Sequence, residues 1–143
     1  MRFGIGFIAA ALIAGAPAAL AQDVKISPDQ ANSKTQAAAG TVQAHINAYR
    51  SRNLTQFVNT FAPNAVVTMN GVTLANGRQE IRELYRLNFT DAAPQIRVDR
   101  SGMNGDNVYL SVAYAFADGT ETCCSYSEYQ IVGGQITRLD TQG

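Results

Sequence analysis

The sequence predicts an α+β fold in which three helices pack on one face of a curved antiparallel sheet. In the first part of the chain, apolar residues recur at the spacing of amphipathic helices, as Val42, Ile46 and Tyr49 do. From Gln95 onward, apolar and polar residues alternate with a period of two, and turn dipeptides separate the runs. A block of helices followed by a block of strands is typical of helices gathered on one side of a sheet.

The first 21 residues are expected to be a secretory signal peptide and not part of the fold. Arg2 precedes an apolar run rich in Gly and Ala, and Ala19-Leu20-Ala21 forms a small-x-small cleavage pattern. The run is too short for a good membrane span. We therefore expect an exposed segment over residues 22–36, one domain over residues 37–143, and a periplasmic or secreted protein that leaves the membrane after cleavage.

Composition narrows the classes of function. The 143 residues carry 11 basic and 11 acidic side chains, and 46% of them are hydrophobic. A chain of this size and apolar content supports one core. Nucleic-acid binding usually requires an excess of clustered positive charge, so no nucleic-acid partner is predicted. The sequence contains no P-loop or dinucleotide fingerprint, and no cofactor is predicted.

Two consecutive helices are predicted first. The first begins at about Asp29 and ends over residues 50–52. Asn53 is placed to cap the second, with Gln56 three residues later, and Pro63 stops it. The apolar faces of these helices are Val42, His45, Ile46 and Tyr49, and then Leu54, Phe57, Val58 and Phe61.

One strand and a third helix follow. The β-branched run over residues 65–70 predicts a strand, and Gly71 turns the chain. Asn76 is the expected cap of the third helix, which ends near residues 91–94. Its apolar face is Ile81, Leu84, Tyr85 and Phe89.

The remainder of the chain predicts an antiparallel meander. Turns are expected over residues 104–107, at Asp118-Gly119 and at Gly133-Gly134. The strands between them are residues 95–100, 108–116, 121–132 and 135–141.

Three segments together resemble a known family. They are FAPNAVVTM over residues 61–69, NGRQEIR over residues 76–82 and GGQIT over residues 133–137. With the same order of elements, these segments are similar to the nuclear transport factor 2-like superfamily, which includes SnoaL-like polyketide cyclases, ketosteroid isomerases and limonene-epoxide hydrolases. The resemblance spans residues 37 to 141.

The resemblance implies a cone-shaped sheet wrapped around three helices, a cystatin-like α+β roll enclosing one apolar pocket. It also implies a homodimer formed through the sheet. Because this fold hosts enzymes, carriers and scaffolds, the reaction does not follow from it.

The resemblance also suggests roles for single residues. His45 falls where ketosteroid isomerases carry their oxyanion-donating tyrosine, so it is a candidate donor or base. The catalytic carboxylate of those enzymes falls at Met69, and their second acidic donor falls near Cys124. Neither Met nor Cys replaces a carboxylate, which disfavours steroid isomerisation by that route.

Cys123 and Cys124 stand side by side in the long predicted strand. Neighbours on a strand point to opposite faces, which disfavours a disulfide between them. One thiol is therefore expected to face the pocket and the other the outer surface, with an intermolecular bridge as an alternative. His45 is the only imidazole, so no metal site is predicted.

The resemblance places Cys124 on the inner face, and alternation then places Tyr126 and Glu128 on the same face. A carboxylate held in an apolar pocket has a raised pKa, which makes Glu128 with His45 the candidate acid/base pair. A salt bridge to an arginine is the alternative for Glu128. The opposite face, with Ser125, Ser127 and Tyr129, is expected to suit a dimer contact. The expected ligand-binding residues are Tyr49, Val67, Met69, Leu84, Cys124 and Tyr126.

The leading hypothesis is that the pocket binds a small, mostly apolar ligand. The first alternative is a cofactor-independent isomerase, cyclase or hydratase that uses His45 and Glu128. The second is a non-catalytic dimerisation module. The sequence leaves open whether the protein is an enzyme.

Overall fold

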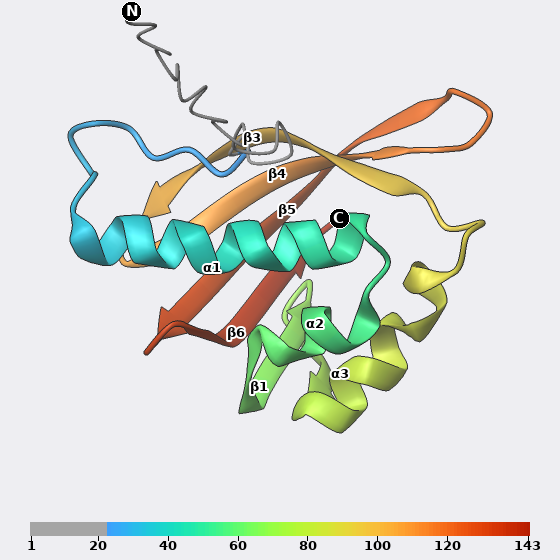
Figure 1. Ribbon diagram of the computed structural model, residues 1–143, viewed down its shortest axis with the longest axis horizontal. Coiled ribbons are helices and arrows are strands. Elements are labelled where there is room, and N and C mark those ends of the chain that lie inside the picture. The colour runs from blue at the N-terminus through green and yellow to red at the C-terminus, as the bar shows by residue number, and fades with distance from the viewer. Residues whose placement is uncertain (1–22) are drawn as a thin grey trace, which may run out of the picture.

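The computed structural model of the protein describes residues 23–143, so the predicted signal peptide lies outside the described residues. The described chain forms three α-helices, one 3-10 helix and six strands (Figure 1). Within this part of the chain, no helix is long and apolar enough to cross a membrane. The elements are α1 (Ser33–Arg50), α2 (Leu54–Asn59), β1 (Phe61–Met69), β2 (Val72–Asn76), α3 (Arg78–Tyr85), η2 (Arg86–Phe89), β3 (Gln95–Asn104), β4 (Asn107–Ala115), β5 (Glu121–Val132) and β6 (Gln135–Gln142).

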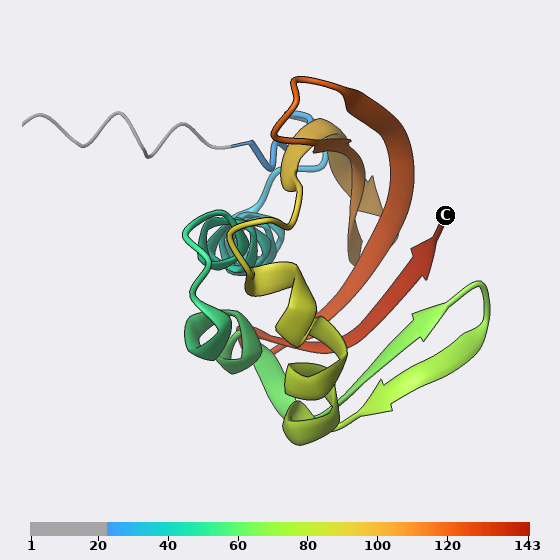
Figure 2. The same cartoon turned by 90° about the vertical axis from the view of Figure 1, so that its right-hand side faces the viewer.

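The predicted α+β class, with a curved sheet around three helices, is confirmed. The six strands have the order β2-β1-β6-β5-β4-β3 in one sheet, which curves around the helices (Figure 2). The expectation of a wholly antiparallel sheet is wrong at one pair, because β1 and β6 run parallel. The hairpin at Gly133-Gly134 sets the direction of β6 against β5, and the free edge of β6 then meets β1 in the same direction.

Helix α1 begins at Ser33, four residues after the expected helix start at about Asp29 and four residues before the expected domain boundary at residue 37. Asn32 accepts a hydrogen bond from the Thr35 backbone N–H at 2.9 Å, and the Thr35 hydroxyl accepts one from the Asn32 N–H at 2.9 Å. This reciprocal cap satisfies two groups that a helix start leaves unpaired. Most of residues 25–36 are exposed, as expected, but Val24 is buried. The backbone N–H groups of Asp23 and Val24 both donate to the Gln43 side chain, which anchors this segment to α1.

The segment between α2 and α3 departs from the sequence prediction. Helix α2 ends at Asn59, and β1 already begins at Phe61, so Pro63 lies in a strand. The five-residue strand β2 was not predicted. Asn70 and Gly71, with φ of 48° and 82°, form the tight turn that folds β2 back on β1. Gly77, with φ of 88°, precedes α3 in place of Asn76, and such a φ favours glycine.

The core lies between the helices and the concave face of the sheet. Its centre is an aromatic cluster around Phe57, which is 1% exposed. The Phe57 ring lies 4.2 Å from the His45 ring, 4.8 Å from that of Tyr85 and 5.0 Å from that of Phe89, measured between centroids. These contacts join α1, α2, α3 and η2 into one layer over the sheet.

The pairing of β4 with β5 contains a bulge that decides which side chains face inward. Near the hairpin, Tyr114 pairs with Thr122, whereas further along Val112 pairs with Ser125. Two residues of β5, Cys123 and Cys124, therefore lie opposite the single residue Ala113. The expectation that these cysteines point to opposite faces and form no disulfide is wrong, because the bulge interrupts the alternation: both are exposed, and a disulfide joins them. One extra residue in a strand reverses the face of every residue beyond it.

Candidate ligand-binding cavity

A cavity of about 230 Å³ lies between the helices and the concave face of the sheet. Its apolar wall includes Ile46, Phe57, Val112 and Leu139 from α1, α2, β4 and β6. The structure places five of the eight candidate site residues around this cavity. They are His45, Tyr49, Val67, Met69 and Leu84.

The described residues that line the cavity include no aspartate, glutamate, lysine or arginine. The polar groups are hydroxyls and amides, such as those of Tyr49, Asn88, Ser127 and Thr141. Two hydroxyls are already paired, since the Tyr114 and Ser125 oxygens lie 3.0 Å apart. A wall of this kind accepts a neutral ligand and leaves a charged ligand without a compensating partner.

Four tyrosines contribute their phenols to the cavity wall, namely Tyr49, Tyr85, Tyr114 and Tyr129. Burial raises the pKa of Tyr49, Tyr85 and Tyr129, and neighbouring phenols raise it further. These three phenols are therefore neutral over the physiological pH range and act as hydrogen-bond donors. The Tyr49 hydroxyl is buried, and the Asn88 amide lies close enough to its oxygen to lower its pKa against the effect of burial, but among residues 23–143 no acceptor for the hydroxyl proton meets hydrogen-bond geometry. A buried hydroxyl without a partner carries a cost that a ligand acceptor would remove.

His45 is 3% exposed and lies among the Phe57, Phe61 and Tyr129 rings. Its Nδ1 is 2.9 Å from the Thr60 hydroxyl oxygen, and that hydroxyl donates to the Phe57 carbonyl oxygen at 2.6 Å. Because the Thr60 proton is committed to Phe57, this network assigns the His45 proton to Nδ1. Burial lowers the pKa of His45 to about 3, so the imidazole is neutral.

The structure does not bring Cys124, Tyr126 and Glu128 to the cavity. The bulge at the cysteines turns Ser125, Ser127 and Tyr129 inward, and their neighbours outward. The expected faces of β5 are thus reversed, which also removes Ser125, Ser127 and Tyr129 from the outer surface proposed for a dimer. Alternation along a strand predicts faces correctly only where no extra residue interrupts the ladder.

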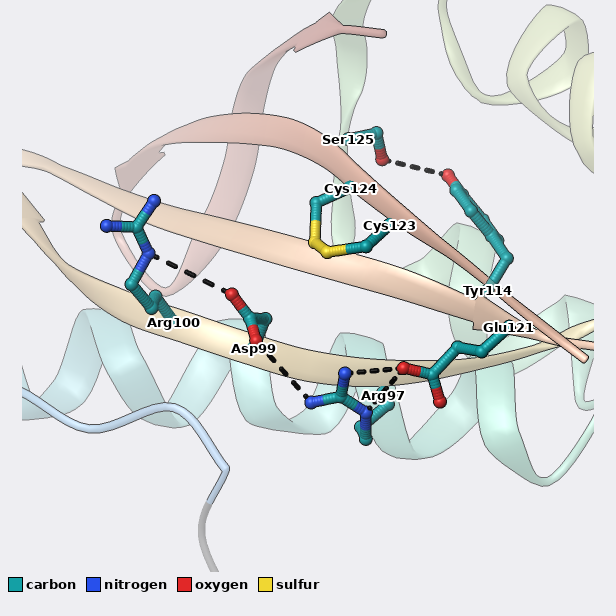
Figure 3. Close-up of a disulfide and its surroundings, with 8 residues drawn as sticks. All are labelled: Arg97, Asp99, Arg100, Tyr114, Glu121, Cys123, Cys124 and Ser125. Carbon is teal, nitrogen blue, oxygen red and sulfur yellow. Dashed lines mark hydrogen bonds and ion pairs between the residues drawn. A yellow bond between two sulfur atoms is a disulfide. The ribbon is translucent and has the colours of Figure 1, made fainter.

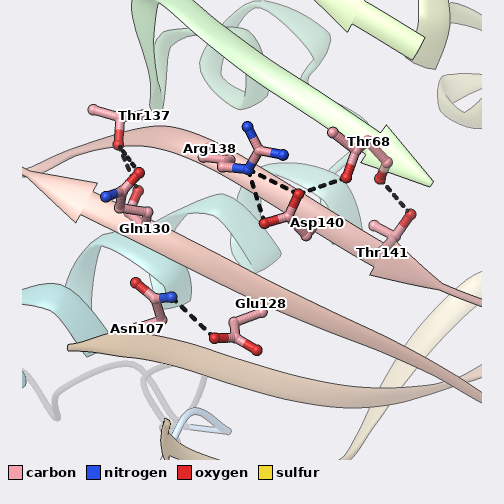
Figure 4. Close-up of polar contacts among 8 residues, drawn as sticks. All are labelled: Thr68, Asn107, Glu128, Gln130, Thr137, Arg138, Asp140 and Thr141. Carbon is pink, nitrogen blue, oxygen red and sulfur yellow. Dashed lines mark hydrogen bonds and ion pairs between the residues drawn. The ribbon is translucent and has the colours of Figure 1, made fainter. Parts of the chain in front are cut away.

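Glu128 lies on the outer face of the sheet in a polar network (Figure 4). Its carboxylate accepts hydrogen bonds from the Asn107 amide at 2.9 Å, from the Asn104 amide and from the Tyr126 hydroxyl. His45 hydrogen-bonds to Thr60 inside the core. The structure therefore does not join His45 and Glu128 as an acid/base pair, and no arginine among residues 23–143 forms the alternative salt bridge with Glu128.

A second polar network on the same sheet joins β1 to β6 (Figure 4). Arg138 donates to both Asp140 oxygens at 2.9 and 3.0 Å, and the Thr68 hydroxyl donates to Asp140. These hydrogen bonds lower the pKa of Asp140, although its burial acts in the opposite direction. This network supports the parallel pair and does not touch the cavity.

Sequence reasoning missed Tyr114, Ser125, Ser127 and Tyr129 as cavity residues. Counting residue pairs of an uninterrupted β4–β5 ladder outward from the Asp118-Gly119 hairpin places Cys124 opposite Val112, which faces inward. This is the face that the resemblance also gave to Cys124. One residue in the sequence argued against this register. The count left Tyr129, a large aromatic side chain, on the outer face of the sheet. Burying Tyr129 and keeping Glu128 in water requires the extra residue that the structure shows.

A sheet that curves around three helices, with an apolar cavity between the layers, is the fold expected from the resemblance to nuclear transport factor 2-like proteins. A family model of the SnoaL-like domain matches residues 42–139, and the chain belongs to this family.

Solved structures have the same fold. A nuclear transport factor 2-like protein of unknown function from Mesorhizobium loti is 15% identical with a TM-score of 0.66, covering 83% of this chain and 98% of that one. A putative polyketide cyclase from Sinorhizobium meliloti is 22% identical with a TM-score of 0.62, covering 72% and 94%. A putative ketosteroid isomerase from Kribbella flavida is 15% identical with a TM-score of 0.62, covering 75% and 77%. No curated protein matches the sequence.

Proposed function

We propose that the cavity binds a small, neutral, mostly apolar molecule that carries one hydrogen-bond acceptor. The observation that carries this proposal is the buried Tyr49 hydroxyl, which lines the cavity beside the Asn88 amide and has no acceptor for its proton among the described residues. A carbonyl or ether oxygen of a ligand would accept its proton. The apolar wall would bury the rest of the molecule.

The size of the cavity limits the ligand. A cavity of about 150 Å³ binds benzene, so a volume near 230 Å³ suits a one-ring compound of roughly nine non-hydrogen atoms. Four fused rings would not fit inside this volume. Steroids are therefore poor candidates, although one of the structural neighbours is called a putative ketosteroid isomerase.

Catalysis by His45 and Glu128 has little support in this geometry. General acid/base transfer requires groups within hydrogen-bond reach of one another or of the substrate. His45 is buried and neutral, and Glu128 lies on the other side of the sheet. A binding role without this pair therefore has better support than a cofactor-free isomerase, cyclase or hydratase that depends on it.

Three compounds of similar size test the proposal by ligand-observed NMR titration. Acetophenone has a carbonyl acceptor, ethylbenzene lacks the acceptor, and benzoate is charged. We expect acetophenone to bind most tightly, ethylbenzene more weakly, and benzoate not at all, because the described cavity wall has no cationic partner. Equal binding of benzoate and acetophenone would contradict the proposal.

Tyr49→Phe should lower the affinity for acetophenone roughly threefold to tenfold, the scale of one hydrogen bond. The affinity of this variant for ethylbenzene should equal that of the native chain. Without ligand, the variant should be at least as stable as the native chain, because it lacks the buried hydroxyl. Tyr109→Phe is the matched control, since Tyr109 stacks on Tyr126 away from the cavity. Met69→Trp at the cavity wall, where Met69 is 44% exposed, should block both ligands.

Export and a homodimer through the outer face of the sheet are part of this proposal. The disulfide between Cys123 and Cys124 supports an oxidising compartment. Native mass spectrometry of protein recovered from the periplasm tests both statements at once. We expect twice the mass of residues 22–143. Recovery of the uncleaved chain would contradict export, and recovery of a monomer at micromolar concentration would contradict the dimer.

A further inference from the structure

Three side chains with metal-ligating atoms gather on the outer face of the sheet, away from the cavity (Figure 3). Cys123 and Cys124 come from β5, and Asp99 comes from β3. One ligand atom of each lies within 4.8 Å of the other two, and all three residues are exposed. The two cysteines are joined as a disulfide, with the Asp99 carboxylate beside it.

Two bulges bring these residues together across β4. In β3, Val98 pairs with Val112 and Arg100 pairs with Ser111, so Asp99 is the extra residue. In β5, the cysteine pair is the bulge opposite Ala113. The bulges thus flank the same short stretch of β4, where Ala113 is fully buried but separate from the main core. Bulges redirect side chains, and both of these direct ligand atoms to one point.

The Asp99 carboxylate is only loosely held by its neighbours. Arg97 approaches it to 3.5 Å and Arg100 to 3.9 Å. The guanidinium of Arg97 forms its short hydrogen bonds with Glu121 instead, at 2.5 and 3.0 Å (Figure 3). A cation that binds Asp99 would therefore displace two weak contacts and leave the Arg97–Glu121 pair intact.

We propose that Cys123, Cys124 and Asp99 form a redox-gated site for a thiophilic divalent cation such as Zn²⁺ or Cd²⁺. An external dithiol reduces the disulfide, is itself oxidised to a disulfide, and leaves two thiols on the protein. The cation binds both sulfurs and releases two protons, while Asp99 supplies a carboxylate oxygen and water completes four-coordination. Two sulfurs about 2.3 Å from a tetrahedral ion are about 3.8 Å apart, so the sulfurs must separate after reduction, while one Asp99 oxygen already lies within 4.8 Å of both.

The disulfide closes the site because its sulfurs are bonded to each other and carry no thiolate. Reduction leaves the rest of the fold in place, since a bridge between adjacent residues closes no loop of chain. Soft thiolate ligands select thiophilic cations over Mg²⁺ or Ca²⁺, which prefer oxygen.

A Cd²⁺ titration tests the site with the mature full-length chain. The protein is reduced with a phosphine, desalted without oxygen, and followed by thiolate-to-metal charge-transfer absorption and native mass spectrometry. We expect one Cd²⁺ per reduced chain and none on the oxidised chain. Circular dichroism verifies that the reduced protein stays folded.

Variants separate a three-ligand site from adventitious binding to thiols. Asp99→Asn should weaken Cd²⁺ binding roughly tenfold or more, because losing a residue that supports a metal site typically costs at least this much affinity. Glu83→Gln is the matched control, because it removes an exposed carboxylate on α3 that is not in the cluster and leaves the Arg97–Glu121 pair intact. Cys123→Ser and Cys124→Ser should each remove the charge-transfer band expected for two sulfurs. The proposal is overturned by equal Cd²⁺ affinity of Asp99→Asn and the native chain, or by a reduced chain that does not bind.

Discussion

Lowering the pH from 6.5 to 4.5 should cost the folded protein about 2 kcal/mol of unfolding free energy through His45 alone. Burial lowers the pKa of this imidazole from its usual 6.5 to about 3. Between these two values the unfolded chain binds a proton that the folded chain does not. Stability therefore rises with pH in this window and is lost as the pH falls, with a limiting slope of about 1.4 kcal/mol per pH unit.

The window belongs to His45 because it is the only histidine. The pKa of the Asp23 and Asp140 carboxylates lies below the usual 3.8; hydrogen bonds and the charges of Arg50 and Arg138 lower it against the opposing effect of burial. A carboxylate whose pKa is lower in the folded state stabilises the protein at any pH above its unfolded-state pKa. This stabilisation is lost as the pH falls from the unfolded-state pKa through the folded-state pKa. These two groups therefore act mainly below about pH 4.

Urea denaturation at pH 6.5, 5.5 and 4.5 measures the effect. His45→Asn retains an N–H donor for the Thr60 hydroxyl but cannot be protonated, so its stability should be nearly independent of pH in this window. Thr60→Val removes the acceptor and should lower stability while keeping the slope. If the native chain shows no loss of free energy between pH 6.5 and 4.5, His45 is not buried as a neutral group.

Phe57→Ala should destabilise the protein by about 3–5 kcal/mol. Phe57 is 1% exposed, and its ring lies within 4.2 to 6.1 Å of five other rings, between centroids. Removing it takes away apolar burial and leaves a void that the helices around it can fill only in part. The loss is a large fraction of the stability of a domain of this size.

Phe116→Ala is the control for this substitution, because Phe116 is 42% exposed. Its cost should stay within about 0.5 kcal/mol, as is usual for a surface site. Urea unfolding of both variants with matched m-values gives the comparison. A Phe57→Ala cost no larger than that of Phe116→Ala would mean that the aromatic cluster does not hold the helices together.

The inner face of α1 was predictable because a helix repeats with a period set by its own backbone. Val42, His45, Ile46 and Tyr49 follow that period, and all four are buried. The helix carries its own hydrogen bonds, so no distant segment changes which residues share a face. The period of two in β4 likewise predicted that Val108, Leu110 and Val112 lie inside.

The residues of β2 and the ends of α2 and β1 were not predictable in the same way. Val72–Asn76 is a short strand that exists because it pairs with β1, and four of its five residues are exposed, so it carries no apolar pattern of its own. Phe61 follows the helical pattern of α2, and Pro63 was expected to stop that helix, but both lie in β1, which pairs with β6. Pairing with a distant segment overrides local propensity in both cases.

The sequence by itself determined the α+β class, the helix faces and therefore half of the cavity wall, including His45 and Tyr49. Only the tertiary structure decided the other half. The ladder between β4 and β5 contains one extra residue at Cys123-Cys124, so Ser125, Ser127 and Tyr129 face inward and Cys124, Tyr126 and Glu128 face outward. A helix keeps its register through bonds within one segment, whereas a strand takes its register from its neighbour, and a single bulge there exchanges the two faces.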